Sequence, residues 1–400
     1  MNSPADKPEA SNIRGYLEGY YGKLFTWEQR IDVLKFLSSK KLNTYCYAPK
    51  EDPNHRLQWR APYSADWIES FSRFAQIAKE QDVSIVAGIA PGLDFTFEAD
   101  GRGNDFDLLL NKAQRFLSSG ATDVLVLWDD IDEDGYINRY GVSEGAAHAQ
   151  TVNQLADVIG QAVWTVPRVY ASDIENTHHY LEDFFNTLHS QHTVLLCGKA
   201  IVPSSVQPED LTNLCRGANK QSQTQPATKH RTVVWDNFYA HDYCPRRLFV
   251  GPWTGRDNIE HYLLNPTGMP FTDQLLLDVA ASTQICAHPL EVWQSVLSRH
   301  GVPEEFQLIA PYFSHPFFGD QPVYGDSRDT HCAWPNAEPA SIDIEQAIEH
   351  CLWKWKSPLA REWYPYIFGL KHDLAIQQNA LPEDRILKTQ SPALAYRLLR

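Results

Sequence analysis

The sequence contains few cysteines, and no two of them have the spacing of a metal-binding or redox pair. The chain of 400 residues has seven cysteines, an odd number, and no C-x2-C motif occurs. A disulfide framework or a zinc ribbon would require such pairs, so the sequence argues against both. The polar start MNSPADKPEASN also lacks the charged and then apolar pattern of a secretion signal. We therefore expect a reduced, cytoplasmic protein.

Long apolar runs and an excess of positive charge are missing as well. The best apolar stretch, VSIVAGIA at residues 83–90, is far shorter than the ~18–20 residues that a transmembrane helix needs. Asp and Glu total 50 against 35 for Lys and Arg, which gives a net charge of −15. A chain with this charge is poorly suited to bind nucleic acid or an anionic membrane, so we expect neither as a partner.

What the sequence does contain is a regular alternation of apolar runs and amphipathic helical patterns, up to about residue 290. One helical pattern begins at a capping box formed by Thr26 and Gln29, and a later one ends at Gly120. Seven apolar runs are predicted as strands: residues 14–18, 42–47, 83–90, 124–128, 166–170, 194–196 and 232–235. An eighth strand is less clear and is expected at residues 251–253 or 262–264.

Strands that are apolar throughout and separated by helices are typical of a parallel sheet that is buried on both faces. A doubly wound sheet usually carries a glycine-rich phosphate loop, and neither GxGxxG nor GxxxxGK[ST] occurs here. We therefore predict an α/β fold, a (β/α)8 TIM barrel. The predicted domains are a flexible N-terminus at residues 1–12, the barrel at 13–295 and a smaller, mostly helical C-terminal region at 296–400.

The C-terminal region has its own pattern. Residues 311–339 are rich in Pro, Gly, His and aromatics and predict a loop-rich connector, and a final helix is predicted at residues 383–400. Residues 342–370 predict a helical segment that Pro358 and Pro365 break or kink. Its large aromatic side chains must pack on the barrel, on one another or on a second subunit, so a homodimer is one expected assembly. These side chains are Trp353, Trp355, Trp363 and Tyr366.

The most informative polar pattern is VLVLWDDID, in which Asp129 and Asp130 directly follow an apolar strand. In a TIM barrel the active residues lie at the C-terminal ends of the strands. Repulsion and partial burial should raise the pKa of one carboxyl group and leave the other ionised. That division suits glycoside hydrolysis, in which one carboxyl group protonates the leaving oxygen. A solvated acidic turn and a divalent-metal site remain alternatives, while no HExxH motif supports zinc.

Polar residues follow the other predicted strands too, where a pocket would lie. Asn and Asp side chains are natural partners of sugar hydroxyls, because each can bind two neighbouring groups. Simpler interpretations exist: Asp236 or Asn237 as a helix cap, Trp235 as a core residue and Lys50 as a surface residue. The residues at these strand ends are Glu18 and Gly19, Lys50, Tyr170, Cys197 and Gly198, and Asp236 and Asn237.

Five sequence blocks, taken together, resemble glycoside hydrolase family 84, the family of protein O-GlcNAcases and related bacterial β-N-acetylglucosaminidases. They are GYLEGYYGKLFTWEQR, LNTYCYAPKEDPNHRLQWRAPY, APGLDF, VLWDDID and VVWDNFYAHDYCPRRLFVGPWTGR, in the order of the family and within residues 13–290. The resemblance implies a TIM barrel followed by helices and a glycosidase that needs no metal or organic cofactor. It also implies substrate-assisted catalysis with retention, in which the 2-acetamido oxygen of the sugar forms an oxazoline.

The resemblance also implies roles for individual residues. Asp129 would orient and polarise the acetamido N–H, and Asp130 would be the general acid and then the base. Tyr170 would steady the acetamido group, and Trp235 would form a wall of its pocket. The other residues implied to bind substrate are Gly19, Lys50, Cys197, Asn237, Asp242 and Asn265.

The sequence departs from the family pattern at two places. Residues 167–170 read Pro-Arg-Val-Tyr where the family often has Pro-Thr-Glu-Tyr, and Cys197-Gly198 stands where Thr-Gly is common. Both departures bear on the affinity of the pocket and leave the reaction unchanged. Two other functions stay open: hydrolysis of small GlcNAc-containing glycans or cell-wall fragments, and GlcNAc binding without catalysis. The intact pair of Asp129 and Asp130 argues against the second.

Overall fold

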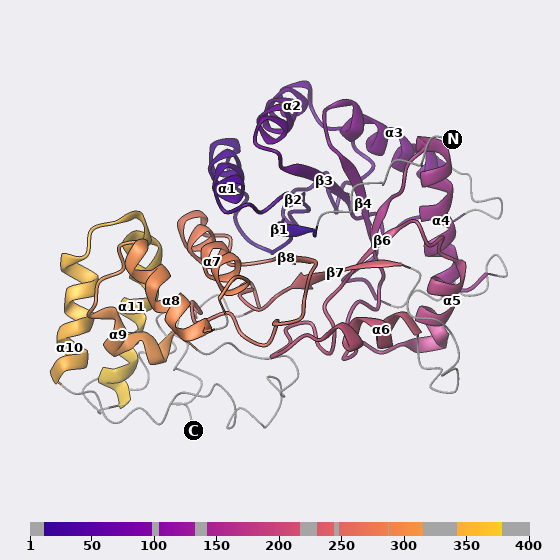
Figure 1. The fold of residues 1–400 in the computed structure, drawn as a ribbon. Coiled ribbons are helices and arrows are strands. Elements are labelled where there is room, and N and C mark those ends of the chain that lie inside the picture. Colours follow the sequence, from indigo (N-terminus) through magenta and orange to yellow (C-terminus); the bar gives the residue numbers. More distant parts are fainter. Residues whose placement is uncertain are drawn as a thin grey trace, which may run out of the picture.

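A computed structural model of the chain is shown in Figure 1. It describes residues 12–97, 104–132, 142–216, 230–243, 248–286, 288–314 and 342–377. Most of the predicted connector and the helix predicted at residues 383–400 lie outside the described residues.

Eight parallel strands close into a barrel in the order in which they occur in the chain, and β1 pairs with β8 to complete it (Figure 1). The fold is therefore the predicted TIM barrel, and its eighth strand lies at residues 262–264 and not at 251–253. The strands are β1 Arg14–Glu18, β2 Thr44–Tyr47, β3 Ser84–Ile89, β4 Asp123–Leu127, β5 Trp164–Val166, β6 Thr193–Leu196, β7 Arg231–Asp236 and β8 Tyr262–Leu264.

Helices surround the barrel and begin where local sequence signals predict. The side chain of Thr26 accepts the N–H of Gln29 while the side chain of Gln29 accepts the N–H of Thr26, so the predicted capping box is present. Gly120 has a φ of 102° just after α3, a conformation that suits glycine at a helix end. The helices are α1 Trp27–Ser39, α2 Ala65–Glu80, α3 Asn104–Ser118, α4 Glu144–Ile159, the short η2 Thr177–His179, α5 Tyr180–Thr187, α6 Pro208–Arg216 and α7 Pro270–Thr283.

Strand β5 ends earlier than the sequence predicted. The apolar run suggested a strand that ends at Tyr170, but the last residue of β5 is Val166. Pro167 has no N–H to donate to a neighbouring strand, so the regular ladder stops there. Ala171 then forms an isolated bridge with Gly198. Tyr170 therefore lies on a loop that rejoins the sheet beyond the end of the strand.

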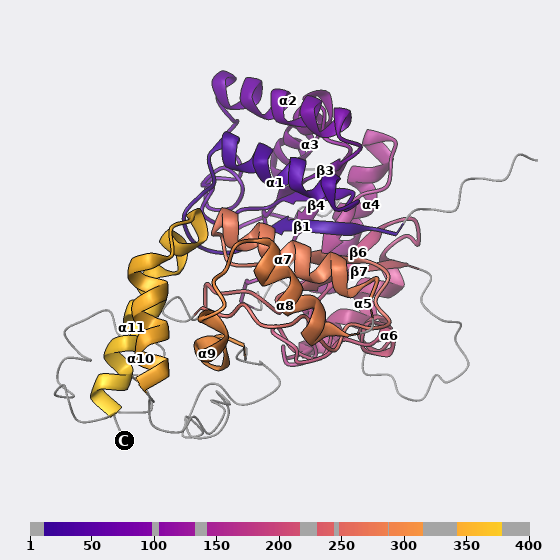
Figure 2. The same cartoon turned by 60° about the vertical axis from the view of Figure 1, so that its left-hand side comes forward.

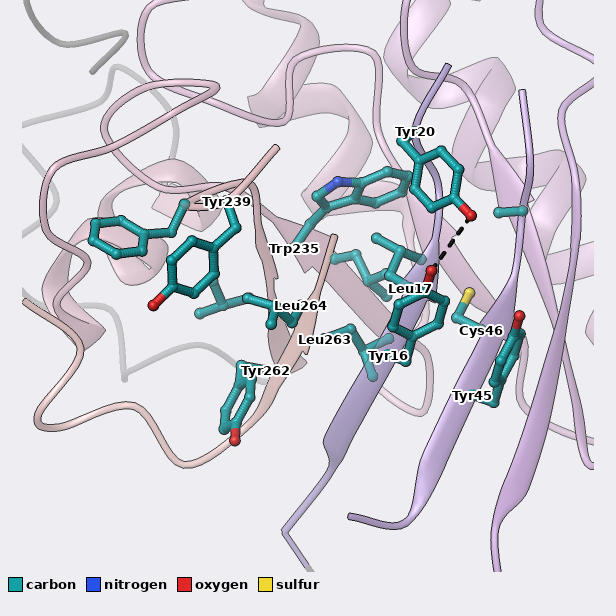
Figure 3. Packing of buried hydrophobic residues seen from close by; sticks show 14 of the residues in the cluster. Tyr16, Leu17, Tyr20, Tyr45, Cys46, Trp235, Tyr239, Tyr262, Leu263 and Leu264 are labelled. Carbon is teal, nitrogen blue, oxygen red and sulfur yellow. Dashed lines mark hydrogen bonds between the residues drawn. The ribbon is translucent and has the colours of Figure 1, made fainter. Parts of the chain in front are cut away.

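The core lies in and around the barrel, and its upper layer forms the floor of the site described below. Figure 3 shows Leu17 of β1, Cys46 of β2 and Leu263 of β8 packed together, with Trp235 of β7 above them. All of these side chains are buried. The wide hydrophobic core thus holds the strand ends in fixed positions, which is what a precise site requires.

The C-terminal region is helical and packs beside the last barrel helix. Figures 1 and 2 both show α10 and α11 side by side, next to α7 and α9. The helical path stops before Pro358, as predicted, whereas α11 continues through Pro365. No helix in the described parts of the chain is long and apolar enough to cross a membrane. The elements are α8 Pro289–Arg299, α9 Phe306–Ile309, η3 Ala310–Tyr312, α10 Ile342–Glu349, the π-helical η4 His350–Lys354 and α11 Pro358–Gln377.

The aromatic side chains of this region differ in their surroundings. Trp363 is fully buried, and its indole N–H donates a hydrogen bond of 2.9 Å to Oγ1 of Thr272 in α7. Trp355 is also buried, and the rings of the two tryptophans meet edge to face. Trp353, by contrast, is 52% exposed. The predicted packing of this region on the barrel is therefore confirmed for Trp363, and the predicted division into domains stays a prediction.

Candidate active site

A cavity of about 590 Å³ opens at the C-terminal ends of the barrel strands. This is the edge at which TIM barrels place their active residues. Every predicted site residue except Cys197 lines it. The lining residues are Gly19, Tyr21, Lys50, Asp129, Asp130, Val166, Tyr170, Asp173, Ile201, Val202, Trp235, Asn237, Ala240, Asp242, Tyr243 and Asn265.

Asp129 and Lys50 form a buried ion pair at the bottom of this cavity. Only 4% of Asp129 is exposed, which excludes the solvated acidic turn, and Lys50 is equally buried and not a surface residue. The ammonium group of Lys50 donates a hydrogen bond to Oδ2 of Asp129 and lies 3.6 Å from Oδ2 of Asp130. Burial raises the pKa of Asp129 above its ordinary value, although Lys50 opposes the shift.

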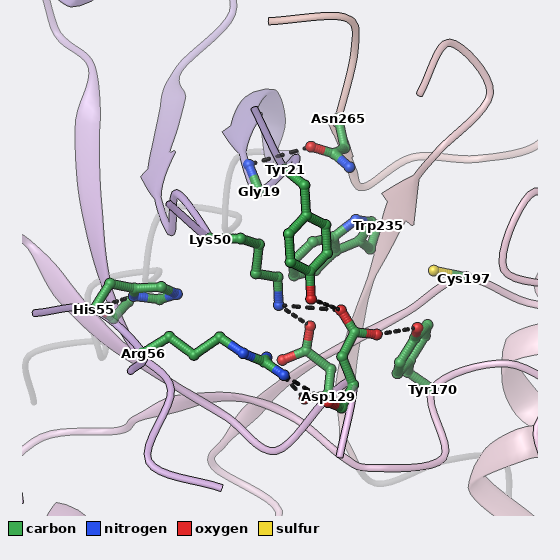
Figure 4. A network of polar contacts seen from close by, with 12 residues as sticks. Gly19, Tyr21, Lys50, His55, Arg56, Asp129, Tyr170, Cys197, Trp235 and Asn265 are labelled. Atoms are coloured by element: carbon green, nitrogen blue, oxygen red, sulfur yellow. Dashed lines mark hydrogen bonds and ion pairs between the residues drawn. The ribbon is translucent and has the colours of Figure 1, made fainter. Parts of the chain in front are cut away.

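Asp130 has a different environment from its neighbour Asp129, because it contacts Tyr21 and Tyr170, which are both labelled in Figure 4. The hydroxyl groups of Tyr170 and Tyr21 donate hydrogen bonds of 2.7 and 2.9 Å to its two carboxylate oxygens. Burial raises the pKa of Asp130, but the charge of Lys50 and these two hydroxyl groups hold it below the ordinary value. The pKa values of the pair are therefore pushed in opposite directions, as the sequence predicted.

The backbone at Asp130 is held in an unusual conformation. Its φ is +54°, in the left-handed region that residues other than glycine seldom adopt. The guanidinium group of Arg56 donates hydrogen bonds to the carbonyl oxygens of both Asp129 and Asp130. We infer that these bonds stabilise the turn, which directs the two adjacent side chains into one cavity.

One oxygen of Asp129 has no hydrogen-bond partner among the described residues. Oδ1 is buried and accepts no hydrogen bond from any residue that the structure describes. A buried carboxylate oxygen without a donor costs free energy, on the order of 1–3 kcal/mol or more for a charged group. Asp129, which lines the cavity, therefore retains an acceptor that a donor group of a ligand could satisfy.

The opposite wall is a chain of amide and indole groups. The N–H of Gly19 donates a hydrogen bond of 3.2 Å to Oδ1 of Asn265, and Nδ2 of Asn265 donates one of 2.8 Å to Asn237. The indole N–H of Trp235 donates to the same Asn237 oxygen at 2.8 Å. A Cβ at Gly19 would lie only 2.6 Å from the ring of Trp235, so this close approach requires glycine. Asn237 therefore belongs to the wall and is no helix cap.

Asp242 and Cys197 complete the predicted set. Asp242 accepts the N–H of Tyr21 at 2.9 Å, and burial raises the pKa of its carboxyl group. Cys197 lies behind the lining, where its sulfur is 3.6 Å from Nδ2 of Asn237. Burial and nearby carboxylates raise the pKa of this thiol well above its ordinary value, so it stays protonated.

Three residues of the site were not singled out from the sequence. Tyr21 and Asp173 line the cavity, and Arg56 holds the turn below the acid pair. The carboxylate of Asp173 accepts the N–H of Ile201 at 3.1 Å, which connects two loops of the rim. Tyr21 and Arg56 both lie in blocks that carry the family resemblance, and Tyr21 also lies just after a predicted strand, which was the available signal.

Two strand-end carboxylates point away from the cavity, contrary to expectation. Glu18 accepts hydrogen bonds from the guanidinium group of Arg30 and from the hydroxyl group of Tyr45. Asp236 forms an ion pair with Arg256 at 3.0 Å, and the indole N–H of Trp253 donates to it. Both carboxylates are fully buried in protein, so their role is structural.

The unusual residue of the Pro-Arg-Val-Tyr segment also turns away from the cavity. The Nε–H of Arg168 donates hydrogen bonds of 2.9 and 3.0 Å to the two oxygens of Glu144. Its guanidinium group lies over the ring of Tyr180. This departure from the family pattern therefore anchors the loop of Tyr170 to α4 and α5 and does not line the pocket.

The sequence left a divalent-metal site at Asp129 and Asp130 as an alternative, whereas the family resemblance implies that no metal is needed. Among the residues that the structure describes, no group of three or more His, Cys, Asp and Glu side chains is arranged to hold a metal ion. Next to Asp129 and Asp130, the ammonium group of Lys50 takes the place that a cation would need.

Comparison with known proteins assigns the family. The family model for beta-N-acetylglucosaminidase matches residues 14–284, which is most of the chain. The chain belongs to this family. The match confirms the family and the class of enzyme, a glycoside hydrolase, that the sequence predicted.

Individual relatives agree with this assignment. The chain is 30% identical over 250 residues to the protein O-GlcNAcases of Rattus norvegicus and Mus musculus, a match that covers 60% of this chain. It spans only 26% of the length of those relatives. A solved mutant of the O-GlcNAc hydrolase of Thermobaculum terrenum has a TM-score of 0.74 at 18% identity, over 95% of this chain and 86% of that one. At this identity the likeness supports the fold alone.

Proposed function

We propose that this chain removes terminal β-linked GlcNAc with retention, and that the acetamido group of the substrate is the nucleophile. The observation that carries the proposal is the buried Oδ1 of Asp129, which accepts no hydrogen bond from the described protein. A 2-acetamido N–H is a donor of the right kind for this oxygen. Its hydrogen bond to Asp129 would increase the electron density on the acetamido oxygen that attacks the anomeric carbon.

In the first step, the acetamido oxygen bonds to the anomeric carbon as the glycosidic C–O bond breaks. Asp130 gives its proton to the departing oxygen, and the negative charge of Asp129 stabilises the positive charge that develops on the acetamido group. In the second step, water attacks the anomeric carbon and loses a proton to Asp130. The oxazoline ring opens, and the sugar leaves with its original configuration.

The pair of carboxylates has to share one proton for this sequence to work. Without ligand, burial favours the protonated form of Asp129, while Lys50 and two tyrosine hydroxyls favour the ionised form of Asp130. A donor bound to Oδ1 of Asp129 would stabilise its ionised form. The shared proton would then move to Asp130, so substrate binding itself would convert Asp130 into the protonated form that acts as the general acid.

The other predicted site residues fit the sugar-holding role that the family resemblance implies. A cavity of about 590 Å³ suits one sugar and the start of an aglycone. We propose that Asn237, Asp242 and Asn265 bind its hydroxyl groups, that Trp235 and Tyr170 flank its acetamido group, and that Lys50 and Gly19 complete the pocket. Cys197 would act indirectly, through its contact with Asn237.

We propose protein-linked GlcNAc as the substrate, because the curated relatives are protein O-GlcNAcases. Small glycans remain the second candidate. A cytoplasmic location and a homodimer are also proposed here. The five described cysteines are free thiols, which agrees with a reducing compartment, and the exposed Trp353 offers an apolar contact for a second subunit.

The test is a set of aryl glycosides that differ only at C2. The β-GlcNAc compound should be hydrolysed, and the β-glucoside, which has no acetamido group, should not. Stepwise fluorination of the acetyl group weakens its oxygen as a nucleophile, so kcat should fall with each fluorine. Asp129→Asn should abolish most of this dependence together with most of the activity, whereas Asp157→Asn on the exposed face of α4 is the matched control. Trapping of a sugar ester on an Asp or Glu by a fluorosugar would contradict the proposal.

A further inference from the structure

Helix α11 touches the catalytic barrel at two loops that carry predicted sugar-binding residues. Figure 2 shows α11 reaching the start of α7 from the side. The first contact is made by Glu362 and Trp363, and the second by Tyr366 one turn further along the helix. Nothing in the proposed chemistry requires residues so far from the acid pair.

The first contact caps α7. The carboxylate of Glu362 accepts the backbone N–H groups of Phe271 and Thr272 at 3.1 and 2.7 Å, and the hydroxyl group of Thr272 at 2.6 Å. The first N–H groups of a helix have no partner within the helix, and the helix dipole favours a negative charge there. An α11 side chain thus replaces the cap that α7 lacks, because its own N-cap residue, Met269, provides no side-chain hydrogen bond.

The capped end of α7 is joined to the loop that carries Asn265. Asp273, in the first turn of α7, accepts the N–H and the hydroxyl group of Thr267 at 2.9 and 2.6 Å and the N–H of Gly268 at 3.1 Å. Asn265 precedes Thr267 by two residues and contacts Gly19 and Asn237 in the cavity. A shift of the start of α7 would therefore reach one wall of the pocket within a few residues.

The second contact reaches the loop after β7. The hydroxyl group of Tyr366 forms a hydrogen bond of 2.8 Å with Nε2 of His241, and the two rings meet edge to face. The next residue, Asp242, accepts the N–H of Tyr21, whose hydroxyl group donates to Asp130. Three hydrogen bonds, the peptide link between His241 and Asp242, and the side chain of Tyr21 therefore connect α11 with the acid.

We propose that Glu362 and Tyr366 are positioning residues, through which α11 fixes the loops of Asn265 and Asp242 in the geometry that binds the sugar. The proposal rests on the proposed function, since it concerns the same pocket. The C-terminal region is then a working part of the catalytic unit and more than a neighbour that protects apolar surface. Its contribution is made to substrate affinity, because neither residue reaches the carboxylate of Asp130 directly.

The experiment uses the full chain and two matched substitutions in the same helix. Tyr366→Phe removes only the hydroxyl group that bonds His241. Tyr364→Phe makes the same change two residues earlier, at a ring that is 38% exposed and stacks on Phe368. Loss of one such hydrogen bond should raise KM for an aryl β-GlcNAc by about 2–10-fold, with kcat changed less than about twofold. Tyr364→Phe should leave both constants unchanged.

A second readout separates positioning from general loosening of the structure. If Tyr366 acts through the sugar-binding loop, its effect should shrink with a substrate that lacks the hydroxyl group held by that loop. The 3-, 4- and 6-deoxy forms of the aryl glycoside are therefore compared, and for at least one of them the KM values of wild type and Tyr366→Phe should converge. Glu362→Gln, which keeps the shape of the cap and removes its charge, should likewise raise KM and preserve kcat.

The outcomes distinguish this proposal from the proposed function. A wild-type chain that does not hydrolyse the β-GlcNAc substrate overturns the function. A wild-type chain that is active, with Tyr366→Phe and Glu362→Gln indistinguishable from Tyr364→Phe in KM, overturns the positioning role alone. Equal penalties on all the deoxy substrates would also contradict it, since they would indicate a general structural effect.

Discussion

Carboxylates at the cavity and carboxylates in the layer between barrel and helices differ in their hydrogen-bond and ion-pair partners. In the outer layer, Glu18, Glu144 and Asp236 are each paired with an arginine. At the cavity, Asp129 shares a lysine with Asp130, and one oxygen of Asp129 has no hydrogen-bond donor among the described residues. Asp129 is about as buried as the three paired carboxylates and differs from them in how completely its oxygens are satisfied, whereas 30% of the Asp130 side chain is exposed.

The number of hydrogen-bond donors around a buried carboxylate distinguishes a structural role from a role in ligand binding. A buried carboxylate with several donors holds chain segments together and has nothing left to offer a ligand. Asp236, for example, is bound by Arg256, by the indole of Trp253 and by the backbone of Phe238. A buried carboxylate that lacks donors costs stability, and the structure retains it only if something else is gained. We infer that the gain at Asp129 is the binding of substrate.

The largest effect should come from removing the acid. Asp130→Asn keeps the shape of the side chain and abolishes proton transfer, so hydrolysis of substrates with poor leaving groups should fall by about 100-fold or more. Aryl glycosides whose leaving groups need no proton should lose much less. The dependence of kcat/KM on the pKa of the leaving group measures this directly. Equal losses across the series would remove Asp130 from the role.

The counterpart in the outer layer should affect stability and not chemistry. Asp236→Asn leaves the charge of Arg256 buried without its partner, which should lower the free energy of unfolding by about 3–5 kcal/mol. Urea unfolding followed by tryptophan fluorescence measures the change, with Asp157→Asn on the exposed face of α4 as the control. For the molecules that stay folded, the dependence on leaving group should match wild type. An Asp236→Asn variant that is as stable as wild type but has an altered dependence on the leaving group would contradict the structural role of Asp236.

The smallest effect should come from a hydroxyl group that contacts the acid. The Tyr21 hydroxyl donates to the carboxylate of Asp130 and so favours its ionised form, which lowers its pKa. Tyr21→Phe removes that donor, the pKa of Asp130 rises, and the pair holds its shared proton to higher pH. The basic limb of the profile of kcat/KM against pH should therefore move to higher pH. An unmoved limb, as expected for the control Tyr364→Phe, would show that the bond is absent in solution.

Much of the fold was predictable because its signals are local. Continuous apolar runs mark the strands, and the capping box at Thr26 and Gln29 needs only four neighbouring residues. The eighth strand was ambiguous because it has three residues, too few for periodicity to distinguish it from the apolar segment at 251–253. Strand β5 was predicted at residues 166–170 but lies at Trp164–Val166, because Val169 and Tyr170 continue an apolar pattern that Pro167 has already ended.

The site was predictable in position but not in detail. The strand-end rule selected Glu18, Asp129 and Asp236 alike, since each follows apolar residues in the same way. What separates them is the guanidinium group that reaches two of them, Arg30 from α1 and Arg256 from the connection between β7 and β8. Such partners are set by tertiary packing and leave no mark in the sequence near the carboxylate. The role of Tyr21 was not predicted either, because Tyr21 and Asp130 are more than a hundred residues apart in the sequence and only the fold brings them into contact.

The bridge beyond β5 has a consequence for any compound made to fit this pocket. The carbonyl oxygen of Tyr170 accepts the N–H of Cys197 at 2.8 Å, and that of Gly198 accepts the N–H of Ser172 at 2.9 Å. The hydroxyl group of the same tyrosine holds Asp130. If the acetamido group lies against Tyr170, as proposed, a larger group there would push this wall, which is hydrogen-bonded twice, outward as one piece and move the tyrosine away from Asp130. Selective ligands should then be extended from the opposite end of the sugar, because a larger acetamido pocket would misalign the proposed proton donor.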